Sequence, residues 1–246
     1  MKGMTQEQLA ARLNACGIPF RPELPGLLLR YHALLMDWNT RMDLTAVTDE
    51  DEMIDRHDVD SLMPLREAAL LPVGARLIDV GTGAGFPGMP LALARPDLRV
   101  TLMDAQQKRL NFLQAVMDEL HVENVTLLHA RAEDGAKNPA LRERFDVAAA
   151  RAVAPLAVLA EYLLPFVRVG GCALCWKGPA LEDELEQGRR AAHLLGGKVG
   201  EPVVCEFPGR AWQHLLLPIQ KKEKTARQYP RKAGTPGKSP LGASDT

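Results

Sequence analysis

Hydrophobic residues in the first part of the chain recur at steps of three and four, which is the spacing of one face of a helix. The clearest run comprises Leu27, Leu28, Tyr31, Leu34, Leu35 and Trp38. Pro19, Pro22 and Pro25 separate this run from an earlier and shorter one. The pattern predicts an N-terminal helical extension over residues 1–70, packed on the rest of the chain.

From about residue 75 the pattern changes to short apolar runs that alternate with amphipathic stretches. The apolar runs are 76–80, 99–104, 125–129, 145–150, 172–177, 203–207 and 212–219. Strands that alternate with helices of ten or more residues predict a mainly parallel sheet covered on both faces, here over residues 71–220. The last two runs are joined by a short connection, so we expect them to pair antiparallel at one edge.

Length and composition indicate one globular unit with a small appended part. The 246 residues are 46% hydrophobic, which is enough for one large core. No run of eighteen apolar residues occurs and the N-terminus lacks the order of a secretory signal, so we expect a cytoplasmic protein that makes no use of a membrane. The few, scattered cysteines suit a reducing compartment, and we interpret Cys172 and Cys175 as core residues rather than metal ligands.

Charge is distributed unevenly along the chain. The net charge of −1 gives no overall case for nucleic-acid binding, but the residues after 220 are rich in Lys, Arg, Pro and Gly. This composition predicts a flexible basic tail over residues 221–246. Its cations would attract phosphates and its tyrosine would stack on an unpaired base. The RNA-binding candidates in the tail are Lys221, Lys222, Lys224, Arg227, Tyr229, Arg231 and Lys232.

A glycine-rich loop, LIDVGTGAGFPG at 77–88, completes and follows the first predicted strand. Glycines allow a tight turn and a close approach of backbone N–H groups to a ligand, which in a parallel sheet lies beyond the carboxyl ends of the strands. Asp79 is placed either to hold an amine-bearing ligand or to fix the loop that contains Gly81 and Gly83. The literal GxGxxG match at 83–88 is weak by itself.

Two further acids follow the next two strands. Asp104 lies 23 positions after Gly81, close to the spacing of about 20 expected for an acid that accepts both ribose hydroxyls. Ala132 and Glu133 follow the third strand, where an adenine would lie. A nucleoside without phosphates but with a charged amino-acid end, S-adenosylmethionine, fits these features. Simple strand-end caps are the alternative for Asp79, Asp104 and especially Glu133.

Eight segments together form a distinctive combination. They are WNTRMDLTAV (38–47), RHDVDSL (56–62), DVGTGAGFPG (79–88), LMDAQQKRLNFL (102–113), ARAEDG (130–135), ARAVAPL (150–156), WKG (176–178) and YPRKAGTPGKSPL (229–241). In this combination the chain resembles the bacterial small-subunit ribosomal RNA guanine-N7 methyltransferases, once called glucose-inhibited division protein B. The likeness covers nearly the whole chain. One departure is Asp43, where the family usually carries asparagine.

The resemblance implies a Rossmann-like α/β fold of the class-I S-adenosylmethionine-dependent methyltransferases, with a seven-stranded, mainly parallel sheet. It also implies S-adenosylmethionine as cofactor and N7 of guanine 527 of 16S rRNA as acceptor, in RNA or in the small ribosomal subunit. The cofactor contacts that it implies by position are Gly81, Phe86, Asp104, Ala132, Glu133 and Arg151, to which the loop adds Asp79 and Gly83.

The chemistry of this reaction requires alignment rather than a general base, because guanine N7 has a free lone pair and no proton to lose. The sequence contains no conventional triad, and we predict no catalytic acid or base and no metal. Arg151, after the fourth strand, and Lys177, after the fifth, are candidates for positioning, with Lys177 also a candidate contact to RNA phosphate. We interpret His57, which has acids nearby, as a residue that fastens the N-terminal extension to the sheet.

Three other functions stay open at this point. An NAD(P)-dependent oxidoreductase would also use GAGFPG and Asp104, although the helical extension and the DVGTGAG context weigh against it. A non-catalytic RNA-binding assembly factor on a methyltransferase fold would share the basic tail. A small-molecule methyltransferase would have little use for that tail. No coiled-coil seam is present, and we expect a monomer.

Overall fold

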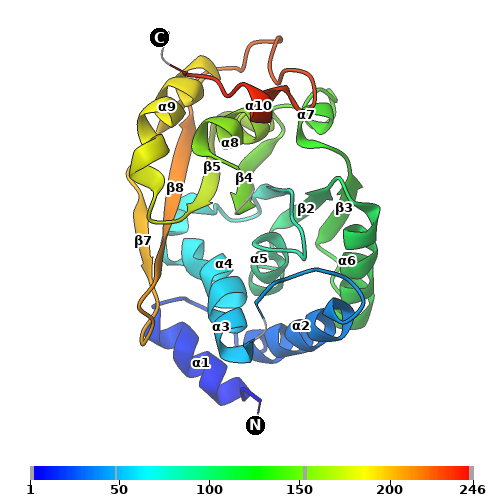
Figure 1. The fold of residues 1–246 in the computed structure, drawn as a ribbon. Helices are drawn as coiled ribbons and strands as arrows, with labels where there is room; N and C mark the ends of the chain where they lie inside the picture. Colours follow the sequence, from blue (N-terminus) through cyan, green and yellow to red (C-terminus); the bar gives the residue numbers. More distant parts are fainter. Residues whose placement is uncertain (1–2, 48, 152–153, 244–246) are drawn as a thin grey trace.

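One eight-stranded sheet forms the centre of the molecule in the computed structural model, which describes residues 3–47, 49–151 and 154–243 (Figure 1). The strand order is β3-β2-β1-β4-β5-β8-β6, with β7 also paired to β8. The strands are β1 Arg76–Val80, β2 Arg99–Asp104, β3 Val125–His129, β4 Phe145–Arg151, β5 Val167–Lys177, β6 Gly197–Val199, β7 Val203–Glu206 and β8 Gln213–Lys221.

The first five strands are parallel, and β8 is antiparallel to β5, β6 and β7. The predicted pairing of β7 with β8 is confirmed. The pair lies at one end of the sheet, as expected, with β8 next to β5 and with β6 and β7 outside it. The sheet has eight strands rather than the expected seven, because the three-residue strand β6 is too short to give a periodic signal in the sequence.

Helices cover both faces of the sheet (Figure 1). Residues that alternate along β1 belong to different cores, since Leu77 joins the cluster with the N-terminal helices and Ile78 joins the cluster with α8 and α9. The helices are α1 Gln6–Ala15, α2 Leu24–Asn39, α3 Glu50–Met53, α4 Asp60–Leu62, α5 Gly88–Ala94, α6 Gln107–Leu120, α7 Ala132–Gly135, α8 Leu156–Leu163, α9 Leu181–Leu194 and α10 Thr235–Lys238. A π-helical segment, Ile54–Val59, and two 3-10 segments, Met63–Arg66 and Ala68–Leu70, complete the N-terminal part.

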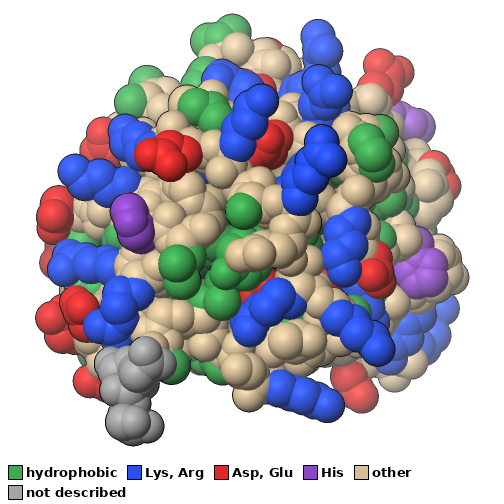
Figure 2. All heavy atoms as spheres, turned by 90° about the horizontal axis from the view of Figure 1, so that it is seen from above, with side chains coloured by type: hydrophobic (Ala, Val, Ile, Leu, Met, Phe, Trp, Pro, Cys, Tyr) green, Lys and Arg blue, Asp and Glu red, His purple; other side chains and the backbone are tan. Residues whose placement is uncertain are grey.

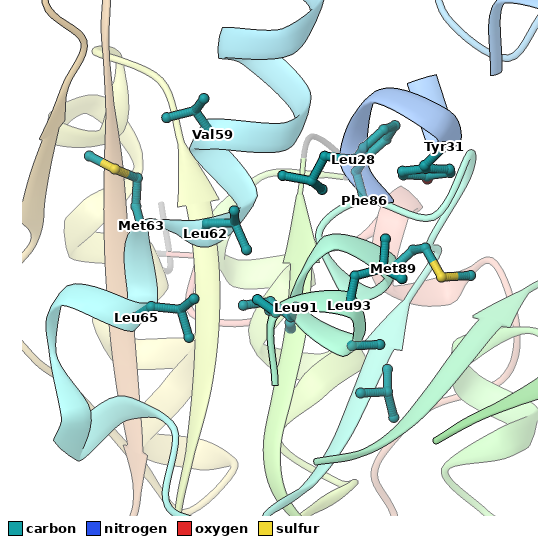
Figure 3. Close-up of a cluster of buried hydrophobic side chains, with 14 of the residues drawn as sticks. Leu28, Tyr31, Val59, Leu62, Met63, Leu65, Phe86, Met89, Leu91 and Leu93 are labelled. Carbon is teal, nitrogen blue, oxygen red and sulfur yellow. The ribbon is translucent and has the colours of Figure 1, made fainter. Parts of the chain in front are cut away.

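The N-terminal helices share a core with the sheet domain. Figure 3 shows Leu28 and Tyr31 of α2 beside Phe86, which follows β1, and Leu62 of α4 next to Leu91 of α5. These side chains are almost completely buried. The apolar face that the sequence pattern predicts for the N-terminal part is therefore the face that covers α5 and one side of the sheet.

The segment after β8 differs from the flexible tail expected from composition. Lys221, the last residue of β8, is only 1% exposed, and its Nζ donates to the Leu164 carbonyl at 2.6 Å. Further along, the Arg231 guanidinium pairs with the buried Glu161 carboxylate at 2.7 Å. A backbone carbonyl and a buried carboxylate of the sheet domain thus supply partners for these basic residues, and residues 221–243 pack across the helical layer. Composition alone does not reveal such partners.

Candidate functional site

The glycine loop after β1 has a backbone that other residues do not adopt easily. Gly83 and Gly85 have φ values of +61° and +102°. A Cβ atom added to Gly85 would lie 2.5 Å from the Tyr31 hydroxyl, so this position also requires glycine for packing against α2. A Cβ on Gly83 would meet nothing within 4 Å, so only the backbone conformation restricts that position.

The side chain of Asp79, near the end of β1, holds this loop in place by hydrogen bonds. Its Oδ2 accepts hydrogen bonds from Thr82 Oγ1 at 2.7 Å and from the Gly88 N–H at 2.8 Å. The other oxygen, Oδ1, has no hydrogen-bond partner among the residues that the structure describes, and the Asp79 side chain is fully buried. Burial raises the pKa of Asp79 to about 6. The loop-fixing alternative is therefore realised, and one carboxylate oxygen remains for a further donor.

A cavity of about 510 Å³ opens above the loop, at the carboxyl ends of β1 and β2. Asp104 contributes its carboxylate to the wall: Oδ1 accepts from the Gln106 N–H at 2.8 Å and Oδ2 from the Gly83 N–H at 3.0 Å. Arg109 Nη1 lies 3.4 Å from Oδ2. We call this the first cavity. Of the predicted site residues, it brings together Gly81, Gly83, Phe86, Asp104 and Arg151.

Phe86 supports the opposite wall of the first cavity. The His57 ring stacks on the Phe86 ring with centroids 4.8 Å apart, and the Arg151 guanidinium lies 5.0 Å from the same ring. Arg151 donates from Nη1 to the Arg56 carbonyl at 2.7 Å and from Nη2 to His57 Nδ1 at 3.1 Å. The end of β4 is thereby joined to the N-terminal extension, which agrees with the fastening role predicted for His57.

His57 is neutral in this environment. Burial, with a further contribution from the Arg151 charge, lowers the pKa of His57 to about 3. Because Arg151 donates to Nδ1, the ring proton lies on Nε2, which donates to Thr45 Oγ1 at 2.9 Å. Thr45 also lines the first cavity, whereas Asp43 is exposed and does not. Sequence reasoning did not place His57 or Thr45 in the site; the family-like segments that contain them were the available signal.

A second cavity of about 350 Å³ adjoins the first at the carboxyl ends of β4 and β5. The two cavities share His57 and Arg151. Basic and aromatic residues dominate the wall of the second cavity, among them Arg56, His57, Arg151, Trp176, Lys177 and His214. The predicted positioning residue Lys177 lies here, but its Nζ is already engaged, 2.5 Å from Glu184 Oε1 and 3.2 Å from the Ala154 carbonyl.

Three predicted cofactor contacts, Asp79, Ala132 and Glu133, line neither cavity. Ala132 and Glu133 form the start of α7, and Glu133 is 3% exposed. Glu133 Oε1 accepts a hydrogen bond from the Gly234 N–H at 2.8 Å, so the C-terminal segment takes the position expected for a ligand. The predicted RNA-binding residues of the C-terminal segment fall into two groups. Lys221 and Arg231 are paired with groups inside the molecule, and Tyr229 is half-buried. The exposed candidates are Lys222, Lys224, Arg227 and Lys232.

Figure 2 shows the end of the molecule near α10, where Lys and Arg side chains are spread around a small hydrophobic area. Acidic side chains lie among them, so this face is mixed rather than uniformly basic. Within the described residues, no group of three or more His, Cys, Asp or Glu side chains has a geometry suited to a metal ion. In the same part of the chain, every helix is too short or too polar to cross a membrane.

The sequence matches the family model described as rRNA small subunit methyltransferase G over residues 26–211. A ribosomal RNA small subunit methyltransferase G from Leuconostoc mesenteroides is 44% identical over 239 residues, which cover 97% of this chain and 100% of that protein. The protein of the same name from Alkaliphilus metalliredigens is 47% identical over 214 residues, 87% of this chain and 89% of its own length.

Solved structures support the fold. A 16S rRNA adenine-N1 methyltransferase variant from Catenulisporales acidiphilia, solved with S-adenosylmethionine, matches with a TM-score of 0.52 and 18% identity over 64% of this chain and 90% of that chain. A second structure of that enzyme gives a TM-score of 0.51 and 16% identity over 73% of this chain and 96% of that chain. The predicted class-I methyltransferase architecture is confirmed. Together with the family model, these relatives show that the chain belongs to the rRNA small subunit methyltransferase G family.

Proposed function

We propose that this protein transfers the methyl group of S-adenosylmethionine to N7 of a guanine in 16S rRNA, at position 527 in rRNA numbering. Family membership supports the class of reaction and the rRNA substrate. The observation that carries the proposal is the pair of adjoining cavities at the carboxyl edge of the sheet, which meet at His57 and Arg151. One cavity suits a cofactor and its neighbour suits the acceptor base.

The residues of the first cavity fit S-adenosylmethionine, which supplies an electrophilic methyl group when bound. Asp104 is a carboxylate at the end of β2, where it is suited to accept the ribose hydroxyls. Asp79 lies beneath the loop and outside the cavity wall, and its Oδ1, which has no partner in the described part of the chain, is suited to the ammonium group of the methionine end. Gly83 leaves open space beside the backbone. No phosphate-binding group is needed, which weighs against a dinucleotide.

The residues of the two cavities position the acceptor and the methyl group and do not transfer a proton. His57 has its Nδ1 occupied by Arg151 and its Nε2 occupied by Thr45, and its lowered pKa keeps it neutral, so it acts as a spacer between the cavities. Arg151 is held on the N-terminal extension and orders the shared wall. An acceptor nitrogen with a free lone pair needs only to be held in line with the methyl group.

We assign the contacts with the RNA backbone to exposed Lys and Arg side chains outside the cavities. Lys222, Lys224, Arg227 and Lys232 remain RNA-binding candidates, because they are exposed and have the charge that phosphates attract. Lys221 and Arg231 leave this set, since their charges are neutralised inside the molecule. An rRNA substrate also places the protein in the cytoplasm, with the small subunit or its rRNA as partner, and we keep the prediction of a monomer.

The direct test is transfer of labelled methyl from S-adenosylmethionine to 16S rRNA and to small subunits prepared from cells without this protein. We expect one N7-methylguanine, mapped to position 527, in the treated RNA and not in the untreated RNA. Unlabelled RNA would favour a non-catalytic assembly factor. Calorimetry with S-adenosylhomocysteine and with NAD separates the remaining alternative, because tighter binding of NAD would favour an oxidoreductase.

A further inference from the structure

The second cavity has a buried carboxylate behind its wall. Asp60 is fully buried, and its Oδ1 has no hydrogen-bond partner among residues 3–47, 49–151 and 154–243. Three cavity residues surround it: Arg151 Nη1 lies 3.5 Å and His214 Nδ1 lies 3.0 Å from Oδ2, and Trp176 Nε1 donates to the Asp60 carbonyl at 3.1 Å. A buried, unpaired carboxylate oxygen costs free energy in a folded protein, so a ligand that pairs with it gains from its presence.

His214 is held by ring contacts rather than by a hydrogen bond from Nδ1. Its ring centroid lies 5.0 Å from that of Trp212, and among the described residues its Nδ1 has no hydrogen-bond partner although it lies near the Asp60 carboxylate. Arg151 is fixed by its bond of 2.7 Å to the Arg56 carbonyl, and Trp176 is fixed by its bond to the Asp60 backbone. The His214 side chain is also 24% exposed. For a base in the second cavity to reach the Asp60 carboxylate, His214 must turn away from it.

We propose that Asp60 recognises the acceptor guanine in the second cavity by accepting hydrogen bonds from its N1–H and its N2 amino group. This inference rests on the function proposed above and names the residue that determines base specificity. Guanine has two adjacent donors on its Watson–Crick edge, and a carboxylate has only acceptors. Adenine has an acceptor at N1 and is rejected. Enzymes that modify a base outside its stack read this same edge.

The geometry of guanine makes this assignment compatible with methyl transfer. N7 lies on the edge of the base away from N1 and N2, so the contact with Asp60 leaves N7 free. An arginine that bound O6 and N7 together would block the acceptor nitrogen, and Arg56 already pairs with Glu52 at 2.6 Å, so we assign Arg56 no contact with the base. The methylated base is a cation, and a nearby carboxylate stabilises the charge that develops on it.

Inosine tests the assignment, because it differs from guanosine only in lacking the N2 amino group. Small subunits are reconstituted with guanine or inosine at position 527, and rates of methyl transfer are compared. We expect the unaltered protein to methylate guanine about 10- to 100-fold faster than inosine, the effect of one hydrogen bond to a charged group. In Asp60→Ala the ratio should fall to the intrinsic difference between the two bases, close to one.

Asp58→Ala is the matched control. Asp58 is equally buried and also has an unpaired Oδ1, but its Oδ2 lies 3.7 Å from His32 and not at the second cavity. Its ratio of guanine to inosine rates should equal that of the unaltered protein. Binding of S-adenosylhomocysteine by each variant verifies that the fold is intact.

A binding measurement makes the same comparison without any variant. The unaltered protein should bind RNA with 7-deazaguanine at the acceptor position more tightly than RNA with 7-deazahypoxanthine. Equal affinities, or a rate ratio that Asp60→Ala leaves unchanged, would overturn the role of Asp60 while leaving the proposed function intact. Failure to methylate either RNA would overturn the proposed function itself.

Discussion

The two cavities are built in different ways. The floor of the first cavity comes from one short stretch, residues 81–84 with Phe86, and from Asp104 on the next strand, and Thr45, His57 and Arg151 add side chains from other elements. The second is assembled from side chains that lie far apart along the chain, from Arg56 in the π-helical segment to His214 in β8. Backbone conformation defines the first cavity, and contacts between separate elements define the second. Substitutions should therefore act on them differently.

Gly85→Val should have the largest effect on stability, because it disturbs the backbone of the glycine loop that forms the first cavity. The new Cβ would lie 2.5 Å from the Tyr31 hydroxyl at a φ of +102°. We expect a loss of about 4 kcal/mol or more in the free energy of unfolding, from overpacking and strain together. Urea denaturation measures it. Gly74→Val is the control, since its φ is +68° but nothing lies within 4 Å; an equal loss in both variants would mean that packing against α2 is unimportant.

Asp79→Asn should remove a pH-dependent contribution of about 3 kcal/mol to the free energy of unfolding. Burial raises the pKa of Asp79 to about 6 in the folded protein, above its value in the unfolded chain. Asp79 therefore contributes stability below pH 4 that is lost as the pH rises through 6, about 1.4 kcal/mol for each pKa unit. Denaturation at several pH values should show this fall in the unaltered protein and in the exposed control Asp118→Asn, but not in Asp79→Asn.

The same carboxylate provides a binding test of the first cavity. If the ionised Asp79 pairs with the ammonium group of the cofactor, affinity for S-adenosylhomocysteine should increase about tenfold from pH 5 to pH 7. Calorimetry should show a flat profile in Asp79→Asn. A profile that is identical in both proteins would leave Asp79 with its loop-fixing role alone.

Arg151→Lys should affect both cavities through their shared wall. Lysine lacks the two guanidinium nitrogens that bond the Arg56 carbonyl and His57 Nδ1, so the wall shared by the two cavities loses its fixed position. We expect kcat to fall about 100-fold, the usual effect of misalignment, with a smaller change in cofactor affinity. Arg168→Lys, at an exposed pair with Asp146, should leave both unchanged. A change in affinity alone would restrict Arg151 to the first cavity.

Substitutions in the C-terminal segment should have the smallest effect and spare both cavities. In Lys224→Ala/Arg227→Ala/Lys232→Ala, three exposed charges are lost. RNA affinity should fall modestly, and the slope of log affinity against log salt should decrease by about 2, for three phosphate contacts to a single strand. Filter binding over a salt series measures both. An unchanged slope would exclude these residues from the RNA contact.

The outcome for individual residues shows which features the sequence can predict. The strand starts at 76, 99, 125 and 145 were predicted correctly, because continuous apolar runs bounded by polar residues are a local signal. The strand β6 was missed because three residues carry no period. His57 was predicted only to fasten the N-terminal extension to the sheet, and Asp60 was seen only as one residue of the segment 56–62. Their importance depends on neighbours that lie more than ninety residues away, such as Arg151 and His214.

The sequence by itself determined the α/β architecture, the glycine loop and the acid at the end of β2, since each depends on backbone geometry and on residues close together in the chain. Only the tertiary structure decided that Glu133 is occupied by the C-terminal segment and that Lys221 is buried. It also decided that Asp60 lies behind the second cavity. The physical reason is that burial and pairing of a charged group depend on which distant element packs against it, and composition contains no record of that partner.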